Sequence, residues 1–159
     1  MYITRAEYAE LYDNMDEKIF NRLAIDAFRV MDIHTTGVDN VKKLKAFFPE
    51  DEDGATAVKH CAAKLINTME QVQKAEASVT GFEVTDHGVH GKVISSISAG
   101  NESISYATGS TSAVDEAAKD INVRSKLYAN IVCDYLRGVV DKNGVNLLYK
   151  GEYPRRFLC

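Results

Sequence analysis

The residues with the most evident potential for chemistry are two histidines that lie close together in the sequence DHGVHG. His87, His90 and the neighbouring Asp86 are of types that bind transition metals. A closed metal site needs about four ligands at suitable spacing, and no second cluster of such residues accompanies this one. We therefore interpret DHGVHG as a solvated loop flanked by glycines, and we expect no bound metal.

A second candidate pair is His60 and Cys61, as base and nucleophile. They are adjacent on a predicted helix, so their side chains point about 100° apart and do not face each other. Cys61 is better explained as a small, buried, apolar residue. The chain also lacks the G-x-S-x-G nucleophile elbow and the G-x-x-x-x-G-K-[ST] phosphate loop. The sequence thus predicts neither catalytic residues nor a cofactor, and no enzyme.

The composition is typical of a soluble globular chain with a single domain. Its 159 residues include 19 Lys and Arg against 23 Asp and Glu, a net charge of −4, so no general attraction to nucleic acid phosphates is expected. No apolar run approaches the roughly 20 residues that a membrane span needs. The three cysteines are an odd number without paired spacing, which is typical of a reducing cytoplasm. We expect a protein that is made and kept inside the cell.

The elements that would position any functional surface are mostly helices. Thr4 and Glu7 match the S/T-x-x-E capping box and predict a short first helix that ends near residues 13–14. Asp16 is a good N-cap for a second helix, and Gly37 would end it. Apolar residues at helical spacing give the second helix one buried stripe, made of Ile19, Phe20, Leu23, Ala24, Ala27, Phe28, Val30 and Met31.

Three further helices are predicted downstream. Residues 38–48 form a short helix stopped by Pro49, and residues 54–77 form a long helix that follows an acidic run. Residues 113–137 form the closing helix, and Gly138 suits the position just past its end. We therefore expect a mainly α protein built as a bundle of four to five helices.

Residues 92–106, with the sequence KVISSISAGNESISY, have no helical period. Two short runs of alternating apolar and small polar residues flank a turn-forming Ala-Gly-Asn, which predicts a β-hairpin that protrudes from the helices. A lone hairpin is marginally stable in water, so we expect a partner to stabilise it. Its contact residues would be Val93, Ile94, Ile97, Ile104 and Tyr106.

Residues 145–159 also lack a helical period and predict an extended C-terminal arm beside a helical domain of residues 1–144. Two interpretations of this arm compete. It completes the core of its own chain, or it reaches a neighbouring protein as extended peptides do. The adjacent charges of Arg155 and Arg156 favour the second interpretation, for which the contact residues would be Leu147, Leu148, Tyr149, Tyr153 and Phe157.

The order of these pieces resembles the head–tail connector, or adaptor, proteins of tailed bacteriophages. Four stretches carry the resemblance: the opening helix, the second helix with its threonine-containing end, the serine-rich hairpin and the leucine-tyrosine-glycine tail. In this sequence they read MYITRAEYAELYD, DEKIFNRLAIDAFRVMDIHTTG, GKVISSISAGNESISYA and GVNLLYKGEY. Residues 79–91 have no clear counterpart in that family.

The resemblance implies a structural virion protein without catalytic residues, assembled in the bacterial host cytoplasm and located at the neck of the virion. Such proteins form a ring, usually of about twelve copies, beneath the portal at the capsid vertex. The ring extends the DNA channel and lets DNA pass without binding it specifically. The implied partners are further copies of the chain, the portal protein and a tail-side connector or tail terminator protein, and no membrane is involved.

A small helical DNA-binding or regulatory protein is the alternative from a different class. The glycine turn at Gly37 between two helices resembles a helix-turn-helix. A recognition helix should cluster basic residues, and Lys42, Lys43 and Lys45 form only a modest group. A small enzyme is a further alternative, for which the sequence offers no residues to name.

Overall fold

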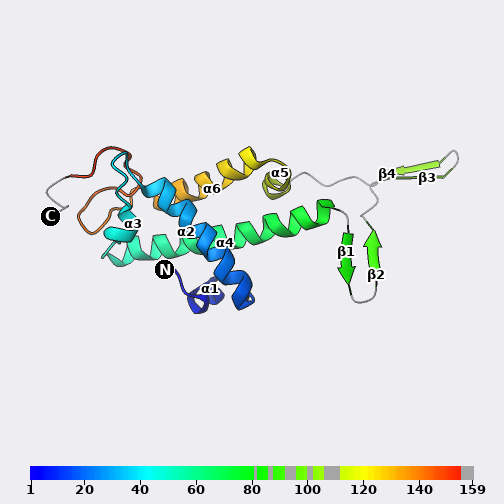
Figure 1. Ribbon diagram of the computed structural model, residues 1–159, viewed down its shortest axis with the longest axis horizontal. Helices are drawn as coiled ribbons and strands as arrows, with labels where there is room; N and C mark the ends of the chain where they lie inside the picture. The colour runs from blue at the N-terminus through cyan, green and yellow to red at the C-terminus, as the bar shows by residue number, and fades with distance from the viewer. Residues whose placement is uncertain (81, 86–87, 92–95, 100–101, 106–111, 155–159) are drawn as a thin grey trace. The chain divides into compact units, whose positions relative to one another are not determined.

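The computed structural model describes residues 1–80, 82–85, 88–91, 96–99, 102–105 and 112–154, and it is mainly helical, as predicted (Figure 1). Within this part of the chain the helices are α1 (Arg5–Leu11), α2 (Glu17–Thr35), α3 (Lys43–Ala46), α4 (Glu52–Thr80), α5 (Ala113–Lys119) and α6 (Ile121–Leu136). None of these helices combines the length and the apolar character that crossing a membrane requires.

The first two helices begin where their capping residues predict. The Thr4 hydroxyl accepts a hydrogen bond from the Glu7 amide at 3.3 Å, and the Glu7 carboxylate accepts one from the Thr4 amide at 2.7 Å, which confirms the capping box. The Asp16 carboxylate accepts from the Lys18 amide at 2.9 Å at the start of α2. Glu7 also accepts from the Lys59 ammonium at 2.6 Å, so the cap of α1 is connected to α4.

The closing helix differs from its prediction, because residues 113–137 form two helices rather than one. Asp120 has an extended backbone, and its carboxylate accepts from the Asn122 amide at 2.7 Å. An aspartate that bonds an amide two residues ahead favours a helix start over a helix interior, and α6 begins directly after it. The apolar period continues through Asp120 and therefore gives no sign of the break.

Two compact units divide the chain. Residues 1–69 and 126–159 form the first unit, and residues 70–125 form the second. The C-terminal residues belong to the same unit as the N-terminal ones, and the predicted division into a helical domain of residues 1–144 and an arm of residues 145–159 stays a prediction. In the second unit, the Arg124 guanidinium donates to the Ala117 carbonyl at 3.0 Å and pairs with the Glu76 carboxylate.

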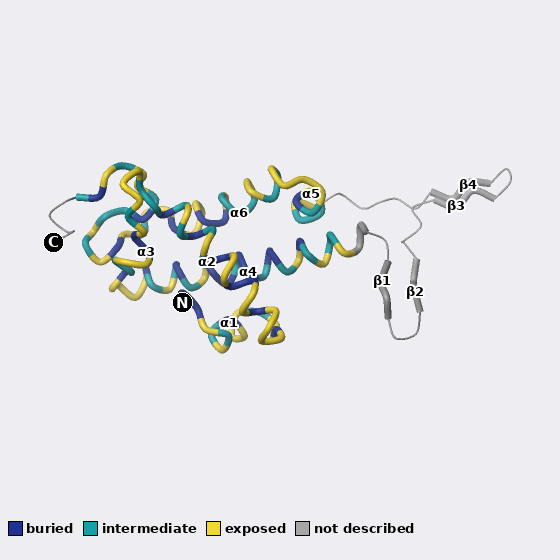
Figure 2. Tube along the Cα trace, viewed as in Figure 1, coloured by how far each residue is buried: buried dark blue, intermediate teal, exposed yellow. Residues whose placement is uncertain are grey.

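The core of the first unit lies between α2, α4, α6 and the C-terminal residues (Figure 2). Small side chains on α4, among them Cys61, Ala62 and Ala63, are fully buried and allow close packing of neighbouring helices. Cys61 is thus buried as predicted, and its burial raises the pKa of the thiol to about 12. The predicted stripe of α2 is mostly buried, but Ile19 at its start is 39% exposed.

Four short strands are described by their backbone alone: β1 (Phe82–Thr85), β2 (Gly88–Gly91), β3 (Ser96–Ala99) and β4 (Glu102–Ser105). They form two antiparallel pairs, β1 with β2 and β3 with β4. His90 belongs to β2, whereas Asp86 and His87 lie outside the described residues. Residues 92–95, 100–101 and 106 of the predicted hairpin also lie outside them, so the protruding hairpin stays a prediction.

A candidate docking groove on helix α2

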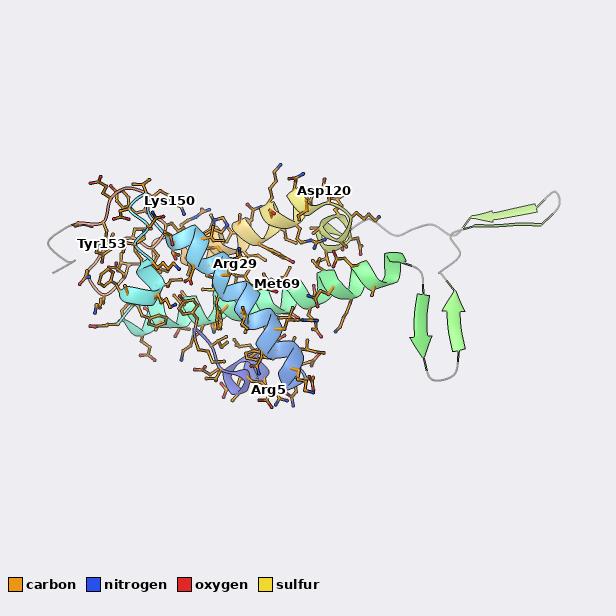
Figure 3. All side chains as sticks on the ribbon, in the orientation of Figure 1. Arg5, Arg29, Met69, Asp120, Lys150 and Tyr153 are labelled. Atoms are coloured by element: carbon orange, nitrogen blue, oxygen red, sulfur yellow. The ribbon has the colours of Figure 1, made fainter. Side chains whose placement is uncertain are left out.

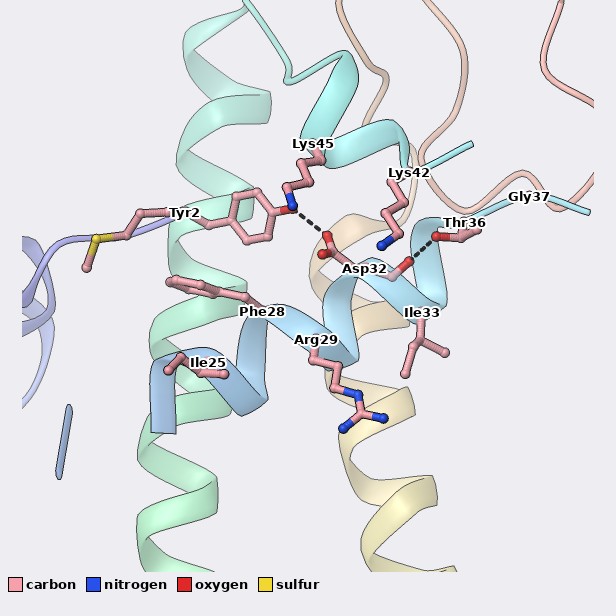
Figure 4. Close-up of a pocket in the computed structure, with 11 residues that line it drawn as sticks. Tyr2, Ile25, Phe28, Arg29, Asp32, Ile33, Thr36, Gly37, Lys42 and Lys45 are labelled. Atoms are coloured by element: carbon pink, nitrogen blue, oxygen red, sulfur yellow. Dashed lines mark hydrogen bonds between the residues drawn. The ribbon is translucent and has the colours of Figure 1, made fainter. Parts of the chain in front are cut away.

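A groove in the first unit combines apolar and cationic side chains (Figure 4). Its walls come from the N-terminal segment before α1, the exposed side of α2 and the residues that lead into and through α3. The cavity has a volume of about 790 Å³. Its lining residues are Met1, Tyr2, Ile25, Phe28, Arg29, Asp32, Ile33, Thr36, Gly37, Lys42 and Lys45.

The apolar part of the groove lies on the surface of α2. Ile25 and Ile33 are 69% and 58% exposed, and they lie on either side of Arg29 at steps of four residues, so the three share one face of the helix. The half-buried Phe28 forms the floor and packs edge-on against the Tyr2 ring, with 5.0 Å between ring centroids. Large apolar side chains gathered on one exposed face are typical of protein interaction sites.

The charged part of the groove is positive. Arg29, Lys42 and Lys45 are exposed, and no carboxylate among the described residues forms an ion pair with any of them. Asp32 is the acidic residue of the lining, and its carboxylate already accepts a hydrogen bond from the Tyr2 hydroxyl. The groove therefore has an excess of cationic side chains in a chain whose net charge is −4.

The Tyr2–Asp32 hydrogen bond fixes the N-terminal segment against α2. Burial and the neighbouring Asp32 carboxylate raise the pKa of the Tyr2 hydroxyl, which therefore stays a donor over the physiological range. The Asp32 carbonyl in turn accepts from the Thr36 hydroxyl at 2.6 Å. Because both polar side chains have their hydrogen-bond partners, the groove is suited to docking through apolar and cationic contacts rather than to proton transfer.

The predicted contact residues of the tail lie elsewhere, and most of them are covered by their own chain. Leu147 is fully buried and Tyr153 is 3% exposed. Leu148 is half-buried against the core, whereas Tyr149 is 51% exposed. Phe157 lies outside the described residues. For Leu147 and Tyr153, the interpretation in which the tail completes the core is the one that the structure supports.

Two turns precede the predicted arm. After α6, Gly138 and Gly144 have φ angles of +80° and +77°, and such angles permit tight turns. The Asp141 carboxylate accepts from the Asn143 and Val145 amides at 2.9 Å each and closes the second turn. The chain thus reverses direction before Leu147, whose amide donates to the Val139 carbonyl at 3.0 Å.

Lys43 anchors the returning tail. Its side chain is buried, and its ammonium donates to the backbone carbonyls of Asn146, at 3.0 Å, and of Tyr149. Burial lowers the pKa of this ammonium. Lys43 is therefore a structural residue and not part of a basic surface, which leaves Lys42 and Lys45 as the exposed members of the predicted lysine cluster.

Tyr153 provides the second anchor (Figure 3). Its hydroxyl donates to the Asp141 carboxylate at 2.5 Å and accepts from the Asn143 side-chain amide at 2.9 Å. Its backbone amide donates to the Asp39 carboxylate at 2.6 Å, and its ring stacks on Phe47 with centroids 4.7 Å apart. Burial and the Asp141 bond raise the pKa of the Tyr153 hydroxyl to about 12.

The remaining sequence candidates do not form a site in the described residues. Ile97 and Ile104 lie opposite each other in β3 and β4, while Val93, Ile94 and Tyr106 lie outside the described residues. His60 is exposed beside Leu11, Tyr12 and Tyr135, at the rim of a small cavity. Among the described residues, no cluster of His, Cys, Asp and Glu has the arrangement of a metal site.

The groove was missed by sequence reasoning, although its signal is visible in the sequence. Ile25 and Ile33 fall outside the apolar stripe that defines the buried face of α2, and Arg29 lies midway between them. Large aliphatic residues repeated on the polar face of a helix predict a second contact surface. What the sequence does not reveal is that Tyr2 and α3 lie beside that face.

Comparisons with protein-family models, with curated proteins and with solved structures found no match to this chain. The resemblance to head–tail connectors therefore rests on the four stretches of the sequence alone.

Proposed function

We propose that this chain is a head–tail connector, or adaptor, of a tailed bacteriophage. In this role it forms a ring beneath the portal, extends the DNA channel and docks the tail or the next connector component. The observation that carries the proposal is the order of the four resembling stretches along the chain. The mainly helical architecture is compatible with it.

The exposed groove supports a role in assembly rather than in catalysis. Its solvent-facing isoleucines and its cationic side chains provide the apolar and charged contacts that protein interfaces use. With much of the tail folded onto its own chain, the groove replaces the tail as the candidate surface for protein contacts. The strand pairs between α4 and α5 remain a second candidate.

The charge of the chain supports passage of DNA without binding. A net charge of −4 on each copy accumulates around a ring, and a wall of negative potential reduces adhesion of phosphates. The alternative, a helical DNA-binding protein, is weakened because Lys43 is buried and contributes nothing to a basic face. We expect weak or undetectable binding of duplex DNA at physiological salt, measured by electrophoretic mobility shift.

Electron microscopy of the purified protein, alone and mixed with the portal of the same phage, tests the proposal. We expect ring-shaped particles, or an added ring density on the portal. A protein that leaves the portal unchanged and binds duplex DNA with sub-micromolar affinity would contradict the proposal and support the DNA-binding alternative.

A further inference from the structure

A second surface of the first unit has the opposite character to the groove. It lies where α1 meets α2 and consists of the exposed residues Glu10, Leu11, Asp13, Asp16 and Glu17, which we name the acidic corner. Leu11 is 45% exposed and lies beside the half-buried Tyr12. The corner therefore contains four exposed carboxylates and one large exposed apolar side chain.

The acidic corner is held in a defined shape. The Arg5 guanidinium donates to the Met15 carbonyl at 2.9 Å and to the Asn14 side chain at 3.0 Å, and so bridges the connection between the two helices (Figure 3). The Asp16 carboxylate caps α2. Even with the positive charges of Arg5 and Lys18 nearby, carboxylates remain in excess, and none of the four forms an ion pair in the described part of the chain.

The acidic corner and the groove match each other in chemistry. The corner has Leu11 and four carboxylates. The groove has exposed isoleucines and cations that form no ion pair within the described part of the chain. Facing surfaces of opposite charge speed association and suppress incorrect partners. The two surfaces lie toward opposite ends of α2, a helix of 19 residues that is about 28 Å long at 1.5 Å per residue.

We propose that the acidic corner of one copy docks into the α2 groove of the next copy. Because the two surfaces are different patches of one compact unit, the contact is head-to-tail, and such contacts generate a ring when the rotation closes. The inference rests on the proposed ring and names the surfaces that form it. It can fail alone, since a ring can also form through other surfaces.

Charge reversal in two complementary variants tests the contact. The groove variant is Arg29→Glu, Lys42→Glu and Lys45→Glu, and the corner variant is Glu10→Lys and Asp13→Lys. Each variant alone faces a like-charged surface, and we expect its self-association to be at least about a hundredfold weaker than that of the wild type. An equimolar mixture should regain association, because the groove of each variant then meets an oppositely charged corner.

Sedimentation velocity over a range of protein and salt concentrations provides the measurement, and circular dichroism establishes that each variant is folded. A variant with Lys119→Glu, Lys126→Glu and Arg137→Glu changes the net charge as much as the groove variant does, but at exposed positions outside the groove. It should associate like the wild type. Wild-type association should weaken as salt rises, because exposed charges are screened.

Several outcomes would overturn the inference. A groove variant that associates like the wild type, a mixture that fails to recover, or a wild type that stays monomeric at its highest soluble concentration would each do so. Normal self-association combined with lost portal binding would assign the groove to the portal instead. Failure of the proposed function is observed separately, as absence of ring density on the portal by electron microscopy.

Discussion

The C-terminal tail and the α2 groove both lie on α2 and α3, but the tail covers the surface that it contacts, whereas the groove leaves its surface exposed. The tail, of which the structure describes residues 145–154, lies against the end of α2 and against α3. Its Leu147 and Tyr153 side chains are buried, and its backbone is bonded to Lys43 and Asp39. The groove exposes its isoleucines, and its cations form no ion pair with any residue that the structure describes. The comparison shows that apolar composition alone does not distinguish a segment that packs on its own chain from an exposed face that is free for contacts.

Gly37 lies where these two regions meet. It lines the groove, and a Cβ at this position would lie 2.7 Å from the Gly151 carbonyl oxygen of the tail. The adjacent Val38 amide donates to the Lys150 carbonyl at 3.0 Å. Gly37 is therefore explained by close approach of the tail backbone rather than by a left-handed helix end, since α2 already ends at Thr35.

Removal of the tail should have the largest effect on stability. A chain that ends after Gly144 loses the buried side chains of Leu147 and Tyr153 and both acceptors of the Lys43 ammonium. Truncating a single buried leucine to alanine costs 2–5 kcal/mol, so we expect a loss of at least about 5 kcal/mol, comparable to the whole stability of many domains. Thermal unfolding by circular dichroism measures it.

A chain that ends after Pro154 is the matched control, because it keeps every tail contact described above. It should unfold close to the wild-type temperature. If the chain that ends after Gly144 instead keeps its helical content and melting temperature, the tail does not belong to the core, and the contrast with the groove disappears.

Substitution of the buried lysine should have the next largest effect. Lys43→Met keeps the length of the side chain but removes the donor for the Asn146 and Tyr149 carbonyls. Leaving an acceptor without a donor costs about 1–3 kcal/mol. The Asn146 carbonyl still accepts from the Tyr149 amide at 3.1 Å, so we expect a loss of roughly 1–2 kcal/mol in urea unfolding. Lys42→Met, at an exposed groove position, is the control and should change stability by less than about 0.5 kcal/mol. Equal effects at the two positions would contradict the structural role of Lys43.

Tyr153→Phe should change how the stability of the protein depends on pH, because it removes the hydroxyl that anchors the tail. The pKa of the Tyr153 hydroxyl is raised to about 12 in the folded chain from 10.0, so its stabilising contribution is complete below pH 10 and is lost as the pH rises from 10 to about 12. At neutral pH the substitution should cost about 1 kcal/mol, a typical value for one hydrogen bond. Between pH 10 and 12 the difference between wild type and variant should shrink. A difference that stays constant over this range would mean that the hydroxyl does not hold its proton through the Asp141 contact.

Sequence reasoning succeeded where the determinants are local. The caps at Thr4 and Asp16 are formed by residues within one helical turn, and the structure has both helices start there. It failed where the determinants are distant in the chain, since the ammonium of Lys43 bonds a carbonyl 103 positions further on. No local pattern marks Lys43 as the anchor of the tail, and its neighbours Lys42 and Lys45 concealed it within an apparent basic cluster.

Substitutions of the exposed groove residues should have the smallest effect on the free energy of unfolding. Ile25→Ser and Ile33→Ser together change side chains that are 69% and 58% exposed, and exposed substitutions away from caps and cores usually stay within about 0.5 kcal/mol each. Phe28→Ser is the matched control, because Phe28 packs against the Tyr2 ring and its loss should cost about 1–3 kcal/mol by removal of partly buried apolar surface. Urea unfolding compares the two variants.

If the isoleucine variant keeps wild-type stability but loses self-association in sedimentation, the apolar face of α2 serves contacts between molecules. If it loses as much stability as Phe28→Ser, the isoleucines belong to the core, and the groove is structural in the same sense as the tail.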